Sequence, residues 1–203
     1  MDNQLSFDSH IRAVCRSCNY HIRALSHIRN LLPFEIAQTL ACSIVGTRID
    51  YCNALLVGAP KSTLSKLQRI QNNLARVVLQ MPRRTHADPL LYKLHWLPVE
   101  HRVTYKLALL THKVQSTATP QYLNVLLKRR ICDRTLRSSD MLKFDIPRVN
   151  TVIAGRAFRV AAPTVWNSLP RHVSSCSTVT SFKKQLKTHL FNIAFKQFVT
   201  VHN

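Results

Sequence analysis

Apolar residues recur at steps of three and four along most of this chain, and this spacing restricts the fold more than any other feature of the sequence. Between residues 8 and 30, for example, Ile11, Cys18, Ile22 and Leu25 fall on one side of a helix. Only three glycines occur in 203 residues, too few for the many tight turns of a β-sandwich or barrel. The sequence therefore predicts a mainly α fold, a multi-helix bundle punctuated by prolines.

The same spacing indicates where the helices lie. Two are expected to begin at Pro33 and after Pro60, and the others cover about residues 8–30, 87–94, 99–115, 121–127, 155–170 and 178–195. One stretch breaks the pattern: MLKFDIP at 141–147 alternates apolar and charged residues, which suits a half-exposed strand. VNTVI at 149–153 could pair with it, and the two would form a small β-ribbon near residues 140–154.

The chain is strongly basic, and its charge is unevenly distributed. Lysine and arginine number 29 against nine acids, which gives a net charge of +20. The net charge is +1 over residues 1–58, +6 over 59–97 and +13 over 98–203. A surface this basic is typical of proteins that bind polyanions such as RNA or DNA. The distribution predicts a packing scaffold in the first third and the binding surface in the remainder.

Two of the expected helices carry a basic face opposite their apolar stripe. On helix 8–30 this face holds Arg12, Arg16, Arg23, His27 and Arg29. On the helix after Pro60 it holds Lys61, Lys66, Arg69 and Arg76. A face of this kind either contacts phosphates or is simply solvated, and the sequence leaves both interpretations open.

Six cysteines raise the question of a metal site. The nearest approach to one is Cys15-x-x-Cys18 followed by His21, but both thiols fall on the apolar side of helix 8–30. A structural zinc would need a fourth ligand, and no second CxxC or HxxxH lies nearby. We therefore expect Cys15 and Cys18 to be buried thiols, and we expect neither a metal nor another cofactor. The isolated Cys42, Cys52, Cys132 and Cys176 are interpreted as reduced thiols.

No motif typical of an active site occurs in the sequence. The nine acids are scattered singly, without the DD, DxD or ExxE pair that would hold two metal ions for phosphoryl transfer. The motifs GxxxxGK, GxSxG and HExxH are missing as well. His95 and His101 lie on either side of Trp96 and Pro98, where histidine is more often structural than catalytic. We expect no catalytic residues and no enzymatic activity from this chain alone.

Five longer motifs follow one another along the chain. They are RIDYCNALLVGAP, KLQRIQNNLARVV, LHWLPVEHRVTYKLALLTHK, RAFRVAAPTVWNSLP and SFKKQLKTHLF. Their order and spacing resemble the C-terminal region of jockey-like LINE reverse transcriptases, the proteins of non-LTR retrotransposons, over nearly the whole chain. In that family of RNA-directed DNA polymerases, thumb-like helices and a basic extension follow the catalytic palm. The YxDD strand of the palm lies upstream, and nothing corresponding to it occurs here.

The resemblance implies a substrate and a division of the chain. The substrate would be template RNA, primer DNA or their hybrid, and an upstream polymerase palm would be a partner. Residues 1–58 would form a thumb-like scaffold, residues 59–130 a basic helical region and residues 131–203 a basic C-terminal extension with the β-ribbon and terminal helix. No linker separates these segments, so we expect one continuous unit.

The candidate site residues fall into two sets. The matching motif residues are interpreted as packing and turn anchors: Asp50, Tyr51, Asn53, His95, Trp96, Pro98, Trp166, Asn167 and Pro170. The nucleic-acid-binding residues are predicted from charge density alone: Lys61, Lys66, Arg69, Arg76, Arg83, Arg84, Lys128, Arg129, Arg130, Arg134, Arg137, Arg156 and Arg159.

Two functions remain open on the sequence alone. The first is a basic module that binds nucleic acid, a fragment of a reverse transcriptase without the catalytic palm. The second is a helical protein–protein interaction or assembly module, which an exposed apolar patch on the first or second helix would favour. A metal-assisted nuclease would require bound zinc or magnesium. The first residues lack the charged and apolar regions of a secretory signal, so we expect an intracellular protein, nuclear or cytoplasmic, without a membrane partner.

Overall fold

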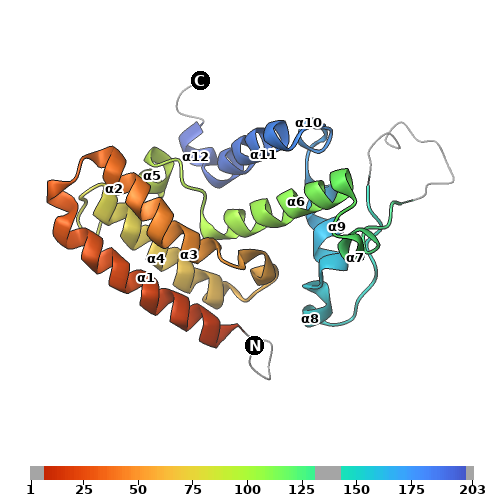
Figure 1. The fold of residues 1–203 in the computed structure, drawn as a ribbon, viewed down its shortest axis with the longest axis horizontal. Coiled ribbons are helices and arrows are strands. Elements are labelled where there is room, and N and C mark those ends of the chain that lie inside the picture. Colours follow the sequence, from red (N-terminus) through yellow and green to blue (C-terminus); the bar gives the residue numbers. More distant parts are fainter. Residues whose placement is uncertain (1–6, 131–142, 200–203) are drawn as a thin grey trace. The chain divides into compact units, whose positions relative to one another are not determined.

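The computed structural model describes residues 7–130 and 143–199, and these are mainly helical (Figure 1). The predicted mainly α fold is therefore confirmed. The described residues form two compact units: unit 1 comprises those up to Val103 and those from Phe191 onward, and unit 2 comprises Thr104–Leu190. The unit boundaries differ from those of the three segments expected from charge and resemblance. In the described part of the chain, no helix is both long enough and apolar enough to cross a membrane.

Unit 1 follows the predicted helical pattern closely. Its helices and helical turns are α1 (Asp8–Ile28), η1 (Arg29–Leu31), α2 (Phe34–Leu40), the π-helical turn η2 (Ala41–Gly46), α3 (Thr47–Asp50), η3 (Asn53–Leu56), α4 (Lys61–Val78), α5 (Ala87–Lys93), the start of α6 (Val99–Thr117) and α12 (Lys196–Val199). Pro33 and Pro60 immediately precede α2 and α4, as expected for a residue with a fixed φ and no N–H to satisfy.

Helices α1 and α4 lie side by side and run in the same direction (Figure 1). At their N-terminal ends, Lys66 Nζ lies 3.2 Å from Asp8 Oδ1. At their C-terminal ends, Gln80 Nε2 donates to Asn30 Oδ1 at 2.8 Å. The predicted stripes face the core between these ends: Ile11, Cys18, Ile22 and Leu25 from α1, and Leu67, Ile70, Leu74 and Val78 from α4. Burial of these two stripes is what stabilises the pair.

Two glutamines of α4 fix the start of α6. Gln71 Nε2 donates to Leu97 O at 2.8 Å, and Gln68 Oε1 accepts from Val99 N at 2.8 Å. The second bond satisfies one of the amides that an α-helix leaves unpaired at its N-terminus. The WLPV segment is thus held against α4 with Trp96 and Leu97 buried.

Residues 191–198 pack in unit 1 through an aromatic cluster. Tyr92 of α5 lies 5.4 Å from Phe191, 5.7 Å from Phe195 and 5.3 Å from Phe198, measured between ring centroids. Phe195 is fully buried. The cluster joins α5 to residues about a hundred positions further along the sequence.

Unit 2 has its own aromatic core. It contains the rest of α6, α7 (Gln121–Asn124), α8 (Val152–Gly155), α9 (Phe158–Ser168), α10 (Arg171–Ser174) and most of α11 (Val179–Ala194). Phe182 of α11 stacks on His112 at 4.2 Å and on Trp166 at 5.8 Å between ring centroids. Phe144 lies 5.8 Å from the same indole, so four rings from four segments meet here.

The predicted β-ribbon near residues 140–154 is wrong. Phe144 forms an isolated antiparallel bridge with Arg129, and residues 152–155 form helix α8. No strand occurs in the described ranges 7–130 and 143–199. The reason is that Phe144 is already paired on both sides, by the backbone of Lys128–Arg130 and by a side chain. Asn167 Oδ1 accepts from Phe144 N at 2.9 Å, and Asn167 Nδ2 donates to Phe144 O at 2.8 Å.

Candidate nucleic-acid interface

The structure places most of the predicted binding residues on the surface. Arg76 and Arg156 are half-buried, and Arg134 and Arg137 lie outside the described residues. The exposed members are Lys61, Lys66, Arg69, Arg83 and Arg84 in unit 1, and Lys128, Arg129, Arg130 and Arg159 in unit 2. The predicted set is therefore divided between the two units.

Both units are basic. The described residues of unit 1 contain fourteen lysines and arginines against five acids. Those of unit 2 contain thirteen against a single acid, Asp145. Each unit therefore has an excess of positive charge, which attracts counter-anions.

A polar groove lies between α1 and α4 near their C-terminal ends, with a volume of about 590 Å³. Its charged lining residues are Arg23 and Arg29 from the α1 side and Arg76 and Arg83 from the α4 side. Arg76 and Arg83 belong to the predicted set, whereas Arg23 and Arg29 come from the part of the sequence interpreted as scaffold. The net charge of each sequence segment did not indicate Arg23 and Arg29 as part of a basic surface. The reason is that the parallel packing of α1 on α4 brings two distant segments together into one surface.

The position of Arg29 differs from the exposed position expected for it. The spacing of helix 8–30 places Arg29 on the outer, basic face, but the residue is only 8% exposed. Its Nε donates to Val78 O at 2.8 Å and its Nη1 donates to Leu32 O at 2.8 Å. The side chain turns inward because α1 ends at Ile28, and carbonyls left unpaired at the end of α4 need donors.

Arg76 is held in place on the opposite wall of this groove. Its Nε donates to Thr85 O at 2.9 Å and its Nη1 donates to Asn73 Oδ1 at 3.1 Å. The first bond ties the loop after α4, which carries Arg83 and Arg84, to the helix itself. Two guanidinium groups of the groove are therefore positioned by hydrogen bonds to neutral groups.

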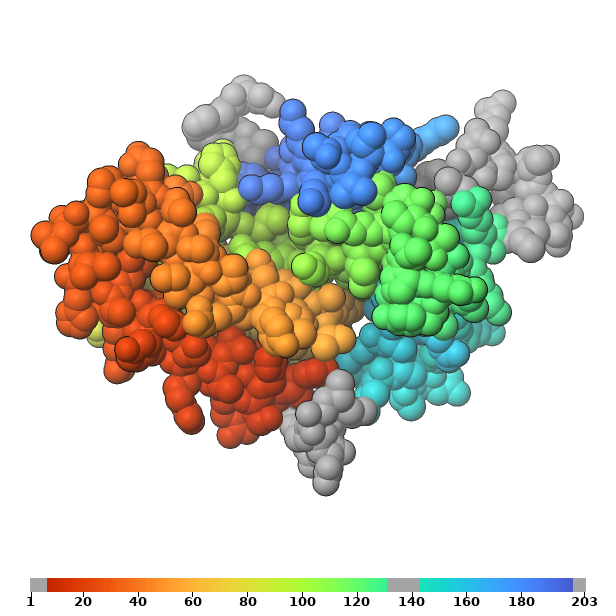
Figure 2. All heavy atoms as spheres, in the orientation of Figure 1, coloured from red at the N-terminus to blue at the C-terminus, as the bar shows by residue number. Residues whose placement is uncertain are grey.

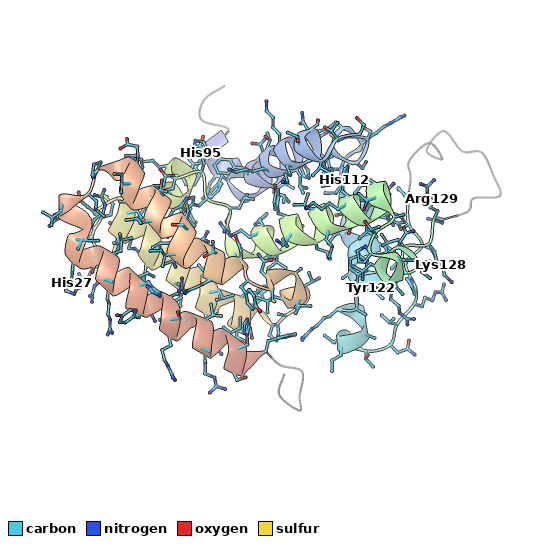
Figure 3. The ribbon with its side chains drawn as sticks, in the orientation of Figure 1. His27, His95, His112, Tyr122, Lys128 and Arg129 are labelled. Atoms are coloured by element: carbon cyan, nitrogen blue, oxygen red, sulfur yellow. The ribbon has the colours of Figure 1, made fainter. Side chains whose placement is uncertain are left out.

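In unit 2, the run Lys128–Arg130 is fixed by its backbone and presents its side chains to solvent. Arg130 N donates to Lys143 O at 2.9 Å and Asp145 N donates to Lys128 O at 2.8 Å. Tyr122 of α7, which is 72% exposed, precedes this run by six residues in the sequence, and it is labelled with Lys128 and Arg129 in Figure 3. Sequence reasoning missed Tyr122, although an aromatic residue near a basic run is a recognised signal for stacking on bases.

Helix α11 adds a second basic face that was not among the predicted sites. Lys183, Lys184 and Lys187 are exposed, while Phe182, Leu186 and Leu190 of the same helix are buried. This is the arrangement of an amphipathic helix whose outer face is positive. These lysines are as closely spaced in the sequence as the predicted cations of α4, so charge density could have indicated them as well.

The anchors of the first motifs connect two parts of unit 1. Arg102 of α6 forms a bidentate ion pair with Asp50, in which Nε donates to Oδ1 at 2.8 Å and Nη2 donates to Oδ2. Asn53 is buried and donates from Nδ2 to Asp50 Oδ1 at 3.0 Å. Arg102 thus links the DYCN and VEHR motifs, a role that the sequence did not reveal.

The other anchors differ in their burial. Trp96 and Trp166 are buried, Pro98 and Pro170 are half-buried, and Asn167 pairs with the Phe144 backbone. Tyr51 and His95 are exposed instead. His95 has a φ of 53° and its ring stacks on Phe191 at 5.3 Å between centroids, so it marks a turn at the surface.

The cysteines and histidines do not form a metal site in the described residues: no group of three or more potential ligands occurs there. Cys18 is fully buried, and burial raises the pKa of its thiol to about 11. Cys15 is half-buried, with a pKa that burial also raises. Cys42 and Cys52 are exposed, and Cys132 lies outside the described ranges. Thiols with raised pKa values are poor nucleophiles and poor metal ligands at neutral pH.

Two histidines are held in apolar surroundings. His112 is buried, and its Nε2 lies 3.0 Å from Cys176 O, so Nε2 carries the proton and donates. Burial lowers the pKa of His101, whose Nδ1 has no hydrogen-bond partner. Comparison of the chain with protein-family models, with curated proteins and with solved structures gave no match.

Proposed function

We propose that this chain is a nucleic-acid-binding module related to the region that follows the palm in jockey-like LINE reverse transcriptases. It contacts the phosphate backbone of RNA, DNA or an RNA–DNA hybrid and reads no sequence. The observation that supports the proposal is a set of exposed cations without carboxylate partners. Among the exposed predicted cations of the described residues, only Lys66 forms an ion pair.

Exposed lysines and arginines without carboxylate partners suit a phosphate backbone. Each contact to a phosphate releases condensed counterions, and this release supplies most of the free energy of binding that does not depend on sequence. Helical nucleic acid of the A form is recognised mainly through its backbone and shape, since its deep groove excludes side chains. Both units supply such surfaces, with Tyr122 available to stack on an unpaired base.

The proposal is tested by titrating the purified chain with labelled RNA, DNA and RNA–DNA hybrid at several salt concentrations. We expect all three to bind, with an affinity that falls steeply as salt rises, because each neutralised phosphate contributes about 0.7 to 0.9 to the logarithmic slope. Replacing Lys128, Arg129 and Arg130 with Ser should reduce that slope by up to about 2 to 2.7. The melting temperature should hardly change, since the run is held by backbone hydrogen bonds.

A matched control removes the same charge from α11 by replacing Lys183, Lys184 and Lys187 with Ser. We expect this variant to lose less affinity for single-stranded RNA, because α11 has no counterpart of Tyr122 beside its lysines. Binding that does not depend on salt, or strong discrimination between unrelated sequences of equal length, would contradict the proposal.

A second candidate function, a protein-interaction module, is favoured by one observation. Ile28 at the end of α1, Leu31 in the turn after it, and Phe34 and Ile36 in the first half of α2 are exposed, with Leu31 at 83%. The part of the chain that carries them is orange in Figure 2 and lies on the surface. Exposed apolar side chains this close together are typical of contact surfaces. If Leu31→Ser and Ile36→Ser together abolish a concentration-dependent self-association seen by sedimentation, and nucleic acid does not bind, this second function replaces the first.

A further inference from the structure

The groove between α1 and α4 combines features that a plain solvated surface would not need. It is lined by four arginines, by the polar side chains of Asn19, Ser26, Asn30, Asn73 and Gln80, and by Ile22, Val77 and Met81. We propose that it is a binding site for a nucleoside phosphate, either free or as one residue of a single strand. The proposal rests on the nucleic-acid binding proposed above and gives it a location and a ligand class.

The charge of the groove favours an anion by a wide margin. Four guanidinium groups bring four positive charges, and no carboxylate is among the lining residues. The C-terminal ends of α1 and α4 also meet here, and each contributes a dipole equivalent to about −0.5 charge. A positive charge of about +3 therefore remains, enough to attract a phosphate after the helix ends are accounted for.

Arg29 provides the strongest argument that the groove suits an anion. A guanidinium has five N–H donors, and the hydrogen bonds of Arg29 to Val78 O and Leu32 O use two of them. The residue is buried, lines the groove and has no carboxylate within ion-pair distance in the described residues. A buried cation is costly unless an anion accompanies it. A phosphate in the groove would supply that anion.

The other lining residues select a nucleotide over a bare phosphate. The volume of about 590 Å³ falls within the range of pockets for small organic ligands, about 300 to 1,000 Å³. Asn19 and Asn73 offer amide donors and acceptors to a base edge or a ribose, and Val77 and Met81 offer apolar contact to a base. A phosphate held at Arg29 would use the arginines of the lining, and a base would contact its amide and apolar side chains.

The test uses the full chain, adenosine monophosphate, inorganic phosphate and adenosine, with binding measured by calorimetry. The groove variant carries Arg23→Gln with Arg83→Gln, since both arginines are exposed and neither has an internal ion pair. The control carries Arg12→Gln with Arg16→Gln, which removes two exposed arginines of α1 that lie outside the groove and outside the predicted binding set. Thermal melts check that both variants remain folded.

We expect adenosine monophosphate to bind more tightly than phosphate, and adenosine not to bind. The groove variant should lose about tenfold or more in affinity for the nucleotide, and the control should change by less than about twofold. Titration of a short single-stranded RNA then separates the two sources of the ligand. If the free nucleotide does not bind but the groove variant weakens RNA binding more than the control does, the ligand is a residue of the strand.

The outcomes distinguish this inference from the function on which it rests. If RNA binds and the two variants weaken it equally, the groove is part of a diffuse basic surface and the inference is overturned, while the proposed function stands. If the chain binds no nucleic acid of any kind, the proposed function is contradicted, and the inference that rests on it is contradicted as well. Nucleotide binding of equal strength in both variants would also overturn the inference.

Discussion

Buried polar side chains in both units bond mainly to backbone groups. Gln71 donates to Leu97 O, Arg29 to Val78 O, and His112 Nε2 to Cys176 O. Each bond satisfies a carbonyl that no helix or strand ladder would pair, and an unpaired buried carbonyl costs roughly 1 to 3 kcal/mol. These residues therefore hold the helix ends and connections in place, while the apolar stripes supply most of the stability.

Trp166 is expected to carry a large share of the stability of unit 2. It is 2% exposed and packs against Phe182, His112 and Phe144. Trp166→Ala should lower the free energy of unfolding by about 3 to 5 kcal/mol, because it removes the indole and leaves a cavity. Thermal melts followed by circular dichroism measure this change.

Tyr122→Ala is the matched control for an exposed ring and should leave the melting temperature within a degree or two. If Trp166→Ala instead remains fully stable but binds RNA poorly, the indole is a stacking platform and its assignment to the core is wrong.

Single residues could be predicted from the sequence only when helical spacing determined their environment. Ile11, Cys18, Leu67 and Leu74 are buried as their spacing requires. Arg29 and Arg102 were missed, since their positions depend on partners 49 and 52 residues away. No local pattern in the sequence encodes contacts of that kind.

At the level of elements, the extended segment at Phe144 shows how a side chain can replace a strand. The backbone N–H and C=O of Phe144 both bond to the side-chain amide of Asn167, which takes the place of the backbone of a neighbouring strand. Apolar and charged residues alternate here as in a strand, but the structure has only the isolated bridge between Phe144 and Arg129. The pattern could not predict the partner, because an asparagine on helix α9 takes the place of the expected strand at 149–153.

Asn167→Asp is expected to destabilise this segment. The change replaces the Nδ2 donor with a carboxylate oxygen facing Phe144 O, so one buried hydrogen bond becomes a repulsive contact. We expect a loss of about 1 to 3 kcal/mol and faster hydrogen exchange at the Phe144 amide, measured by NMR. Asn150→Asp, at an exposed position, is the control. Unchanged protection of the Phe144 amide in Asn167→Asp would show that the side chain does not hold the segment.

At the scale of the whole molecule, positive charge is present in both units, although the sequence indicated a scaffold followed by a basic region. The total of +20 could be counted from the sequence, but its distribution over a surface could not. Surfaces depend on which helices pack together, and the pairing of α1 with α4 joined the least charged third of the sequence to a basic helix.

The stability of the protein should fall as the pH is lowered below about 7. Each unit contains a histidine with a lowered pKa. Burial lowers the pKa of His101 in unit 1. In unit 2, burial is the larger cause and the nearby His172 the smaller cause of the lowered pKa of His189. The unfolded chain, in which histidine titrates near 6.5, then binds more protons than the folded protein just below that pH. The stabilisation is complete above the unfolded pKa and is lost as the pH falls towards the folded values.

Urea unfolding at pH 8, 7, 6 and 5.5 measures this dependence. The midpoint should be constant between pH 8 and 7 and should decrease below that, and His101→Gln should reduce the decrease. A midpoint that rises on acidification would mean that other groups dominate the pH dependence.

The aromatic cluster around Tyr92 has a consequence for the order in which unit 1 folds. Helices α1 and α4 and the segment between them are close in sequence, so they can associate quickly as the chain emerges from the ribosome. Phe191 and Phe195 reach Tyr92 only after about a hundred further residues have been made, and closing so long a loop is slow. During synthesis, the face of unit 1 that carries Tyr92 would therefore stay uncovered until residues 191–198 are made. In refolding experiments the NMR signals of the Tyr92 ring should reach their native positions later than helical circular dichroism does.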